Sequence, residues 1–300
     1  MLPFENITNA EFYELLDSTP VADNNEYFDP SCIVDSYSRD LDPDSCLDPV
    51  LPLNCSDYYD LTDWPSILNS VGPTIKIISQ NIRSLGKNLD EFMHDISPIN
   101  FDVCALSETW VTDDTECLYR SLAGYSGIFN NRASRGGGVG LYISSKLFWN
   151  HLPNISIINN YIETLFVHLP DFNTIVGCIY RPPAGSIRDF NEKLDELLAY
   201  CRSNFENCSI NLCGDFNLNL FRYDSNLGIE NYLNVMFAYN LYPVARKATR
   251  VTQFARTLVD NIWTSDLRIK RSGIIRSNIT DHYPVFIAFC MENHRINVNT

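Results

Sequence analysis

The chain has 300 residues, and 45% of them are hydrophobic, which is enough for a sizeable core and excludes a chain that is disordered throughout. No apolar run approaches the roughly 20 residues that span a bilayer, and the N-terminus has neither the basic nor the apolar region of a secretory signal. The formal net charge of −15 argues against a nucleic-acid partner only if that charge is evenly distributed.

The negative charge is in fact concentrated at the N-terminal end. Residues 1–73 hold 15 acids and a single base, whereas residues 74–300 hold 22 acids and 21 bases. The last 55 residues, from Arg246 onward, hold nine bases and four acids. Because the body of the chain is near neutral and its end is basic, nucleic acid remains open as a partner.

The acidic stretch 1–73 is rich in Asp, Ser, Pro and Asn, and its prolines break any long helix. We therefore expect a disordered segment there, with a segment that binds a protein partner as the alternative. The pattern changes at residue 74. A folded domain is expected over 74–291, followed by a short tail over 292–300.

Within the folded domain, the apolar pattern predicts strands and helices in mixed order. The expected strands are 75–82, 102–109, 137–144, 163–169, 174–180, 209–216, 258–265, 272–278 and 283–289. The expected helices are 87–96, 186–203 and 230–239. This mixture predicts one α/β domain, and the antiparallel strands expected between 137 and 180 argue against a purely doubly wound sheet.

The ten cysteines are scattered, with no CxxC motif and no zinc-like spacing. Several lie in apolar strands, and we interpret them as small buried hydrophobic residues. A chain of this length does not need disulfides. We expect a protein of the nucleus, the cytoplasm or both, neither secreted nor bound to a membrane.

Polar side chains follow several of the predicted strands. These positions are Gln80 and Asn81, Glu108, Asp215 and Asn217, Asp260 and Asn261, and Asp281 and His282. A single Asp or Asn after a strand is usually a turn residue. Five such positions in one domain instead predict a ligand site at the strand ends, where a rigid scaffold makes side chains converge.

The residue types favour one chemistry. Carboxylate and amide oxygens, without Cys or His pairs at ligand spacing, suit a hard cation such as Mg²⁺, with Mn²⁺ as its substitute. Such an ion would neutralise a phosphate and polarise its oxygens. One histidine next to carboxylates can orient a phosphate or move a proton.

The motifs QNIRSL, SETW, YRPP, CGDFN, LVDNI and TDHYPV occur in this order between residues 80 and 285. With these gaps, the chain resembles the endonuclease/exonuclease/phosphatase superfamily. It is most similar to the apurinic-type endonuclease domain of non-LTR retrotransposons, to which RASRGGGVGLYI and YRPP point. The resemblance implies a four-layered α/β sandwich, in which helices flank two packed mixed β-sheets, as in deoxyribonuclease I.

The resemblance also implies roles for individual residues. Glu108 is then the principal metal-binding carboxylate, Asn81 lies beside the metal and the phosphate, and Asp281 is a further acid near the metal. Asp215 and Asn217 are the pair that orients and activates the attacking water.

The same resemblance makes His282 the phosphate-contacting histidine and Asp260 the acid that holds it, as in the Asp–His pairs of other hydrolases. We expect adjacent or near-adjacent antiparallel strands to bring these two residues together. Tyr180 is placed near the scissile phosphate. The predicted substrate-binding residues are Arg181, Thr249 and Arg250, with Arg246 and Lys247 as further candidates for phosphate contacts.

Two positions depart from the family pattern. Asn261 stands where the family often has His, and Thr280 stands where Ser is common, although Thr keeps the hydroxyl group. The glycines of RGGGVG (135–140) could be mistaken for a phosphate-binding loop. That motif lacks the GK[ST] ending and precedes a strand, so its glycines predict a tight turn or bulge.

These features predict a monomeric, Mg²⁺-dependent phosphodiesterase that nicks double-stranded DNA and leaves a 3′-hydroxyl, as in non-LTR retrotransposition. One alternative keeps the fold and changes the substrate, to a phosphatase or a lipid phosphodiesterase. Another is a non-catalytic retroelement fragment that binds DNA or a protein partner. The presence of every motif acid counts against that fragment.

Overall fold

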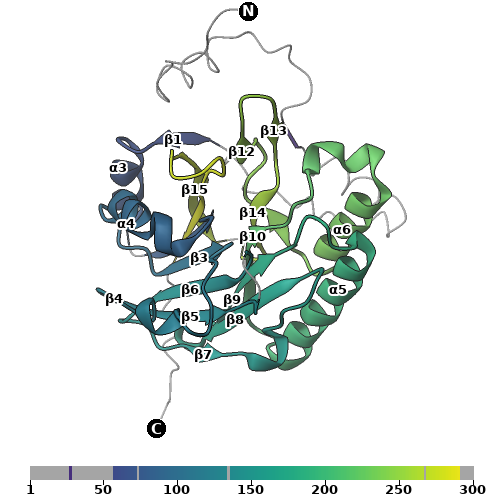
Figure 1. Ribbon diagram of the computed structural model, residues 1–300, viewed down its shortest axis with the longest axis horizontal. Helices are drawn as coiled ribbons and strands as arrows, with labels where there is room; N and C mark the ends of the chain where they lie inside the picture. Colours follow the sequence, from purple (N-terminus) through teal and green to yellow (C-terminus); the bar gives the residue numbers. More distant parts are fainter. Residues whose placement is uncertain (1–26, 29–56, 73, 134–135, 267, 291–300) are drawn as a thin grey trace, which may run out of the picture.

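The computed structural model describes residues 27–28, 57–72, 74–133, 136–266 and 268–290. In this part of the chain, two β-sheets pack face to face and helices cover the outer face of each (Figure 1). The predicted four-layered α/β sandwich is therefore confirmed. No helix among these residues combines the length and the hydropathy needed to span a bilayer.

The larger sheet has eight described strands. In pairing order they are β1 (Tyr58–Asp60), β15 (Ile269–Arg276), β16 (Val285–Cys290), β2 (Thr74–Asn81), β3 (Val103–Ser107), β6 (Val139–Ser144), β5 (Tyr125–Asn130) and β4 (Ser121–Leu122). The strands of the second sheet are β11 (Tyr242–Pro243), β14 (Asp260–Thr264), β10 (Ser209–Asp215), β9 (Thr174–Tyr180), β8 (Glu163–Leu169) and β7 (Asn150–His151). A separate hairpin pairs β12 (Arg250–Val251) with β13 (Arg256–Thr257).

Helices α3 (Trp64–Asn69) and α4 (Leu85–Ile96) cover the larger sheet, while α5 (Ile187–Asn204) and α6 (Leu227–Ala238) cover the second (Figure 1). Four short 3₁₀ helices complete the described elements: η1 (Glu116–Leu118), η2 (Pro153–Ile155), η3 (Pro170–Phe172) and η4 (Leu220–Ser225). Every strand and helix expected from the apolar pattern is present, with ends that differ by a few residues.

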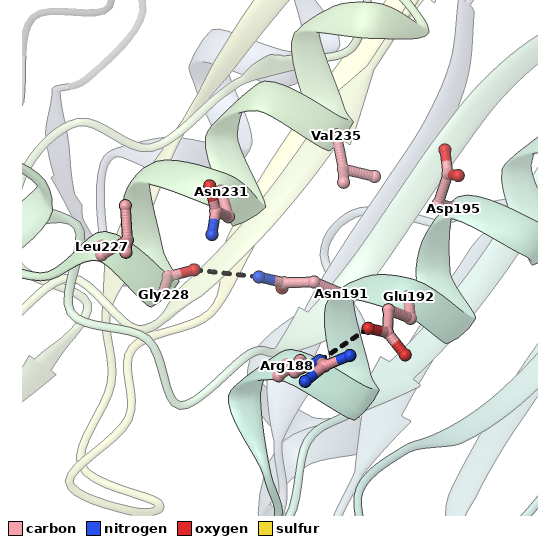
Figure 2. A pocket seen from close by; sticks show the side chains of 8 residues that line it. All are labelled: Arg188, Asn191, Glu192, Asp195, Leu227, Gly228, Asn231 and Val235. Atoms are coloured by element: carbon pink, nitrogen blue, oxygen red, sulfur yellow. Dashed lines mark hydrogen bonds and ion pairs between the residues drawn. The ribbon is translucent and has the colours of Figure 1, made fainter.

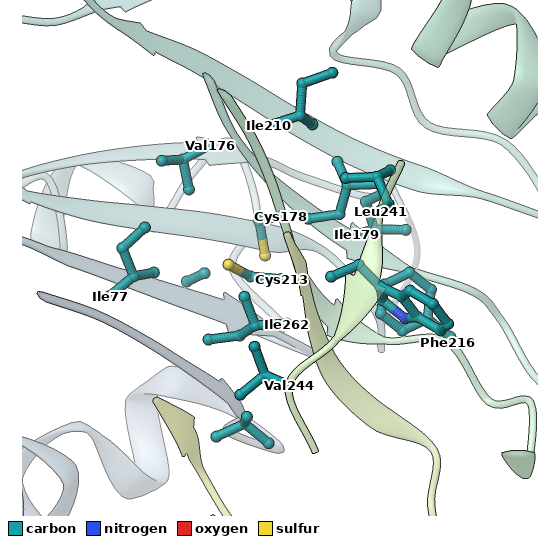
Figure 3. Close-up of a cluster of buried hydrophobic side chains, with 14 of the residues drawn as sticks. Ile77, Val176, Cys178, Ile179, Ile210, Cys213, Phe216, Leu241, Val244 and Ile262 are labelled. Atoms are coloured by element: carbon teal, nitrogen blue, oxygen red, sulfur yellow. The ribbon is translucent and has the colours of Figure 1, made fainter. Parts of the chain in front are cut away.

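The period-2 pattern of the strands separates two hydrophobic clusters. In β2, Ile75 and Ile77 pack toward the second sheet, whereas Ile78 packs toward α3 and α4. Figure 3 shows part of the cluster that contains Ile77, in which Cys178 and Cys213 lie among aliphatic side chains. Both thiols are fully buried and free, as expected for cysteines used as small hydrophobic residues.

Local signals explain why α5 and α6 begin where they do. The Ser186 side chain caps α5 by accepting a hydrogen bond from the Asp189 amide, and the Asn226 side chain caps α6 in the same way. The apolar face of α5 is then buried on the second sheet. These caps are readable from sequence, and both helices were predicted.

The structure corrects the predicted N-terminal boundary for residues 57–72. Within this range β1 pairs in parallel with β15, and Trp64 of α3 is buried and stacks on Phe101 with ring centroids 5.5 Å apart. Burial of an indole provides enough apolar area to order this short acidic stretch. Phe28 is also buried, edge-on against Tyr223. The rest of the acidic segment and the predicted tail lie outside the described residues.

The other strands that were missed have two residues each, apart from the six-residue β5, which pairs with one of them, β4. The YSGIFN sequence of β5 contains Ser, Gly and Asn, and five of its six residues are only half-buried. The strand is held by pairing with β6 on one side and β4 on the other rather than by an apolar pattern of its own. Pairing of this kind is a tertiary property that periodicity does not reveal.

Candidate active site

A row of polar side chains crosses the second sheet at one edge. Tyr180 ends β9 and Asp215 ends the parallel strand β10, and the two residues are paired in register. Asp260 begins the antiparallel strand β14 and pairs with Asp215 on its other side. Directly paired residues point to the same face of a sheet, so these three side chains project together into the space between the sheets.

The larger sheet contributes the opposing side of the site. Asn81 ends β2, and Glu108 follows β3, which runs parallel to β2. The Asn81 side-chain amide donates to Glu108 Oε1 and to Asp215 Oδ2, both at 2.9 Å. One amide thus joins the two sheets at this edge and brings the predicted metal carboxylate next to the predicted water-activating carboxylate.

His282 and Asp260 form the predicted pair. His282 Nδ1 lies 2.9 Å from both carboxylate oxygens of Asp260, and both side chains are almost completely buried. The expected route was wrong, however, because β14 and β16 belong to opposite sheets. The pair forms across the sandwich and not between neighbouring strands.

Thr249 holds the two halves of this pair in place. Its buried hydroxyl accepts the backbone N–H of Asp260 at 2.9 Å, and its carbonyl accepts the N–H of Tyr283 at 2.6 Å. The backbone next to His282 is thereby tied to the start of β14. The structure does not give Thr249 the exposed position that its predicted substrate contact requires.

Asp215 is the most strongly perturbed carboxyl group of the site. Burial raises its pKa, the nearby Asp260 charge raises it further, and His282 partly offsets both. Its Oδ1 accepts the backbone N–H of Asn217 at 2.9 Å. Burial lowers the pKa of His282, but the charge and hydrogen bond of Asp260, with Asp215 and Asp281, raise it overall.

Arg181 holds the loop that carries Asn217 in place. The Arg181 guanidinium is buried and donates to the carbonyls of Phe216, Pro182, Gly185 and Asn217. The Asn217 amide returns a hydrogen bond of 2.8 Å to the Arg181 carbonyl. Arg181 was predicted to bind substrate, but its donors are used by backbone carbonyls, so it supports Asn217 instead.

Asp281 lies in a second ionic cluster, which adjoins the first because Asp281 Oδ1 is 3.9 Å from His282 Nε2. Its two oxygens face Arg83 Nη1 at 2.6 Å and Arg250 Nε at 2.9 Å. Burial raises the pKa of Asp281, but the Arg250 hydrogen bond, His282 and Arg83 lower it overall. The structure therefore gives the predicted metal ligand Asp281 two arginine partners, and Arg250 is half-buried beside it rather than free.

The other two basic candidates are also engaged. Arg246 is buried, donates to the Tyr27 hydroxyl and lies over that ring, with the guanidinium carbon 5.5 Å from the ring centroid. Lys247 Nζ lies 3.8 Å from Asp57 and over the ring of Tyr58. Both residues anchor N-terminal residues on the domain, which the sequence did not predict.

The structure shows what the side chains of Thr280 and Asn261, the two departures from the family pattern, contact. The Thr280 hydroxyl donates to the Asn81 carbonyl and accepts the His282 N–H, both at 3.1 Å, so Thr performs the local role of a serine hydroxyl. The buried Asn261 side chain exchanges hydrogen bonds of 2.9 and 2.8 Å with the Ala245 backbone. It therefore braces the segment that leads into the basic residues.

Backbone strain is concentrated at this edge. Five of the seven described non-glycine residues with positive φ lie in the loops that carry the site: Arg83, Ser84, Glu108, Trp110 and Asn217. Such conformations each cost about 1–3 kcal/mol and persist only where the surroundings enforce them. For Glu108, at φ 52°, the enforcing contact is a 2.8 Å hydrogen bond from the Ser84 amide to its carbonyl.

The donor atoms fit a hard cation. The Glu108 carboxylate is half-exposed at the mouth of the site. Its Oε1 accepts from Asn81, its Oε2 lies 3.4 Å from the Trp110 indole nitrogen, and the Tyr180 hydroxyl is a further hydrogen-bond partner. Mg²⁺ commonly uses one or two protein carboxylates and completes its shell with water and substrate phosphate oxygens. Asp215, Asp260 and His282 also gather within 4.8 Å, but the Asp260–His282 hydrogen bond already uses Nδ1.

Sequence reasoning missed two charged residues at the same edge. Glu163 is completely buried in register with Tyr180, and Arg132 binds its carboxylate. Arg83, which contacts Asp281, was also missed, although it stands inside the QNIRSL motif. Glu163 could have been noticed because it is an acid at the start of an apolar strand. Arg132 could have been noticed because it stands shortly before the run of glycines.

A second concavity lies away from these residues. It has a volume of about 530 Å³ between α5 and α6, and Figure 2 shows Arg188, Glu192 and Asp195 on one side and Leu227 and Val235 on the other. Arg188 is paired with Glu192, and none of the predicted site residues lines the groove. The polar strand ends, and not this groove, are the candidate site.

A family model described as "Endonuclease/Exonuclease/phosphatase family" matches residues 78–282, about two thirds of the chain. No curated protein matches the chain. Among solved structures, the chain is similar to the endonuclease domain of TRAS1, a telomere-specific non-LTR retrotransposon. The two share 10% identity with a TM-score of 0.58, and the match covers 72% of this chain and 98% of that domain.

Two further solved structures show the same fold. The AP endonuclease LMAP from Leishmania major matches at 15% identity with a TM-score of 0.58, over 73% of this chain and 89% of that one. The 3′ phosphatase NExo from Neisseria, bound to a product DNA hairpin, matches at 13% identity with a TM-score of 0.54, over 72% of this chain and all of that one. At such identities the likeness establishes the fold.

Proposed function

The chain belongs to the endonuclease/exonuclease/phosphatase family, and from this premise we propose that it is a Mg²⁺-dependent endonuclease that nicks double-stranded DNA. Members of this family are hydrolases that act on phosphodiester bonds. One observation carries the proposal. Tyr180, Asp215 and Asp260 of one sheet face Asn81, Glu108 and His282 at the same edge of the sandwich.

Glu108 would hold the metal ion, with water and phosphate oxygens as its remaining ligands. The ion supplies Lewis-acid polarisation of the phosphate and stabilises charge that develops in the transition state. Asn81 keeps Glu108 and Asp215 together through the two hydrogen bonds of its amide. The half-exposed position of Glu108 leaves its carboxylate open toward the substrate.

Asp215 is the proposed general base. Its raised pKa gives the carboxylate a greater affinity for the proton of the attacking water, and the Asn217 N–H fixes the orientation of the acceptor. The water oxygen attacks phosphorus while the bond from phosphorus to O3′ breaks. Asp215 takes one proton of the attacking water, and the departing O3′ oxygen takes a proton from solvent water, so the products are a 5′-phosphate and a 3′-hydroxyl.

His282 is the proposed phosphate contact. Asp260 engages Nδ1, so Nε2, which lies 3.9 Å from Asp281 Oδ1, is the nitrogen that would donate to a phosphate oxygen. The same carboxylate favours the protonated, positively charged ring. Burial, the charges of Glu108, Asp215 and Glu163, and a hydrogen bond to Glu108 raise the pKa of Tyr180, so its hydroxyl stays protonated beside the proposed metal carboxylate.

Duplex DNA is the proposed substrate because of what borders the site. The β12–β13 hairpin projects from the molecule next to it (Figure 1). The hairpin begins at Arg250, which is bridged to His282, and its loop carries Phe254 with 90% of its surface exposed. Two of the structural neighbours described above are named as endonucleases, and a third was solved with a DNA product.

The proposal is tested by nicking of supercoiled plasmid by the full chain. We expect the parent protein to convert the plasmid to open circles in Mg²⁺ and to leave it intact in EDTA. We expect the Glu108→Gln variant to leave it intact in Mg²⁺. Equal nicking in EDTA would reject the metal mechanism. A protein that leaves the plasmid intact but releases phosphate from 3′-phosphorylated DNA would be a phosphatase of the same fold.

A further inference from the structure

Glu163 extends the catalytic row by one strand. It begins β8 and pairs in register with Tyr180, which pairs with Asp215, which pairs with Asp260. Residues paired in this way point to the same face, so Glu163 also faces the space between the sheets. Its side chain is completely buried, and its charge raises the pKa of Tyr180. The proposed mechanism gives this buried carboxylate no role.

The carboxylate of Glu163 is used to hold Arg132. Arg132 Nε donates to Glu163 Oε1, while the Gly138 amide donates to Oε2 at 2.6 Å. At Gly137, a Cβ atom would lie 2.5 Å from Arg132 Nε and 2.8 Å from Glu163 Oε1, so only glycine lets the loop close over the pair. The glycines that were predicted to form a turn thus pack directly against the Arg132–Glu163 ion pair.

The same loop is tied to the metal side of the site. The carbonyls of Gly137 and Gly138 accept the backbone N–H groups of Trp110 and Thr109, which follow Glu108. The Asn130 side chain, two residues before Arg132, donates to the Thr164 carbonyl of β8 at 2.9 Å. Arg132 is therefore fixed between the strand ends that carry Glu108 and Tyr180.

The guanidinium of Arg132 keeps part of its donor capacity free. Its carbon lies over the Tyr180 ring, 5.9 Å from the ring centroid, and 24% of the side chain is exposed. Among the described residues, neither Nη atom of Arg132 has a hydrogen-bond partner. A forked pair of N–H donors next to an aromatic ring matches the geometry that arginine uses to bind phosphate.

We propose that Arg132, held by Glu163, binds a backbone phosphate of the DNA strand beside Tyr180, which makes it a substrate-positioning residue of the site. This inference rests on the proposed function. It adds a phosphate contact on the side of Tyr180 opposite to the Asp260–His282 pair. Two neighbouring phosphates of one strand would then be held from two sides of the scissile bond.

Arg181 shows what a purely structural arginine looks like in this fold. Its guanidinium is buried and donates four of its five N–H groups to backbone carbonyls, so no forked pair of donors is left for a phosphate. Arg132, by contrast, has a single carboxylate partner, Glu163, and is partly exposed to solvent. Arg83 and Arg250, the other arginines at this edge, both pair with Asp281.

The test compares Arg132→Lys with the matched variant Arg188→Lys. Arg188 is also paired with a glutamate, Glu192, but lies on α5 away from the site. Lysine keeps the charge that Glu163 requires and leaves the net charge unchanged. Its single ammonium is held at Glu163, and it has neither the planar fork that would reach a phosphate beyond the ion pair nor the planar group that stacks on a ring. Binding of a labelled 20-base-pair duplex is measured in EDTA across a range of salt concentrations, beside plasmid nicking in Mg²⁺.

Arg132→Lys is expected to weaken binding about 5- to 10-fold and to lower the slope of log affinity against log salt by about 0.9, the loss of one phosphate contact. Arg188→Lys should match the parent protein in both. If Arg132→Lys does not fold, the double variant Arg132→Gln/Glu163→Gln removes both charges, leaves no unpaired buried carboxylate and should show the same loss.

Each remaining outcome is decisive. A folded Arg132 variant with the parent affinity and salt slope would overturn the phosphate contact and leave the ion pair a structural one, even if its melting temperature fell. That result, with normal nicking by the parent protein, leaves the endonuclease proposal intact. Failure of the parent protein itself to nick or bind DNA would remove the proposed function and this inference together.

Discussion

Asp281 and His282 are neighbours in the chain, yet they belong to two ionic clusters with different physical character. The Asp260–His282 cluster is dry, with side-chain exposures of 4% and 2%. In the Asp281 cluster, the exposures of Arg83, Arg250 and Asp281 are 38%, 37% and 21%. Asp281 is therefore partly exposed to solvent, whereas the next residue, His282, is buried in the interior.

The difference determines what each cluster can do. Charges act strongly on one another where water is excluded and weakly where water and salt screen them. The dry cluster can therefore fix a proton and orient a ring, which are the tasks of a catalytic pair. The wet cluster can exchange partners, so a DNA phosphate can compete with Asp281 for Arg83 and Arg250. Variants of the two clusters should separate rate from affinity.

The largest effect on rate is expected for Glu108→Gln, at the open carboxylate opposite the dry cluster. An amide is a poorer ligand for a hard cation, and a metal ion is worth several kcal/mol of transition-state stabilisation. Mg²⁺-dependent nicking should fall by about 10³-fold or more. The melting temperature should change little, and Glu192→Gln on the exposed face of α5 provides the control. Parent-level nicking by folded Glu108→Gln would remove this residue from the site.

The next effect is expected within the dry cluster. His282→Ala should lower the nicking rate by roughly 10²-fold or more, the scale of losing one positioned donor to the charge that develops in the transition state. Asp260→Ala should be similar or milder, because Asp260 acts through His282. Single-turnover rates of both variants and of the double variant form the test.

The double variant should be little slower than His282→Ala alone, since groups that act as a unit give non-additive losses. Independent, multiplicative losses would contradict the pairing as a functional unit. If Asp260 has only a structural role at the start of β14, its removal will lower the melting temperature and leave the rate per folded molecule unchanged.

A smaller effect is expected in the wet cluster. Arg250→Gln removes one of the two partners of Asp281 and leaves Arg83 in place. Exposed ion pairs contribute about 0–1 kcal/mol, so the melting temperature should hardly move and DNA affinity should fall several-fold at low salt. The loss should shrink as salt rises, because screening weakens the parent contact. A salt-independent loss of rate would place Arg250 with the dry cluster.

The smallest effect on rate is expected outside both clusters. Trp64→Ala in α3 empties a buried site between Phe101 and Phe286, at a cost of about 3–5 kcal/mol in the free energy of unfolding. The nicking rate per folded molecule should not change. By the same reasoning, a chain that begins at residue 73 should be less stable than one that begins at residue 57, since it lacks β1 and α3. Equal melting temperatures for the two chains would restore the boundary predicted from composition.

Much of this molecule could be predicted because local patterns report burial. The strand that ends at Asp215 and the helix capped by Ser186 follow from apolar periodicity and a capping signal. Polar residues at strand ends predict a site, since parallel strands end at a common edge. The motif order identified the family before any contact between the motifs was known.

The tertiary structure decided which residues the side chains of the site contact. Asp260 and His282 meet across two sheets, Arg181 and Thr249 are buried where exposure was expected, and Glu163 joins the row through register alone. Periodicity reports which face of an element is buried and does not state what lies opposite. Strand register and sheet packing, which join residues far apart in the chain, decide whether an arginine meets four carbonyls, an aspartate or open solvent.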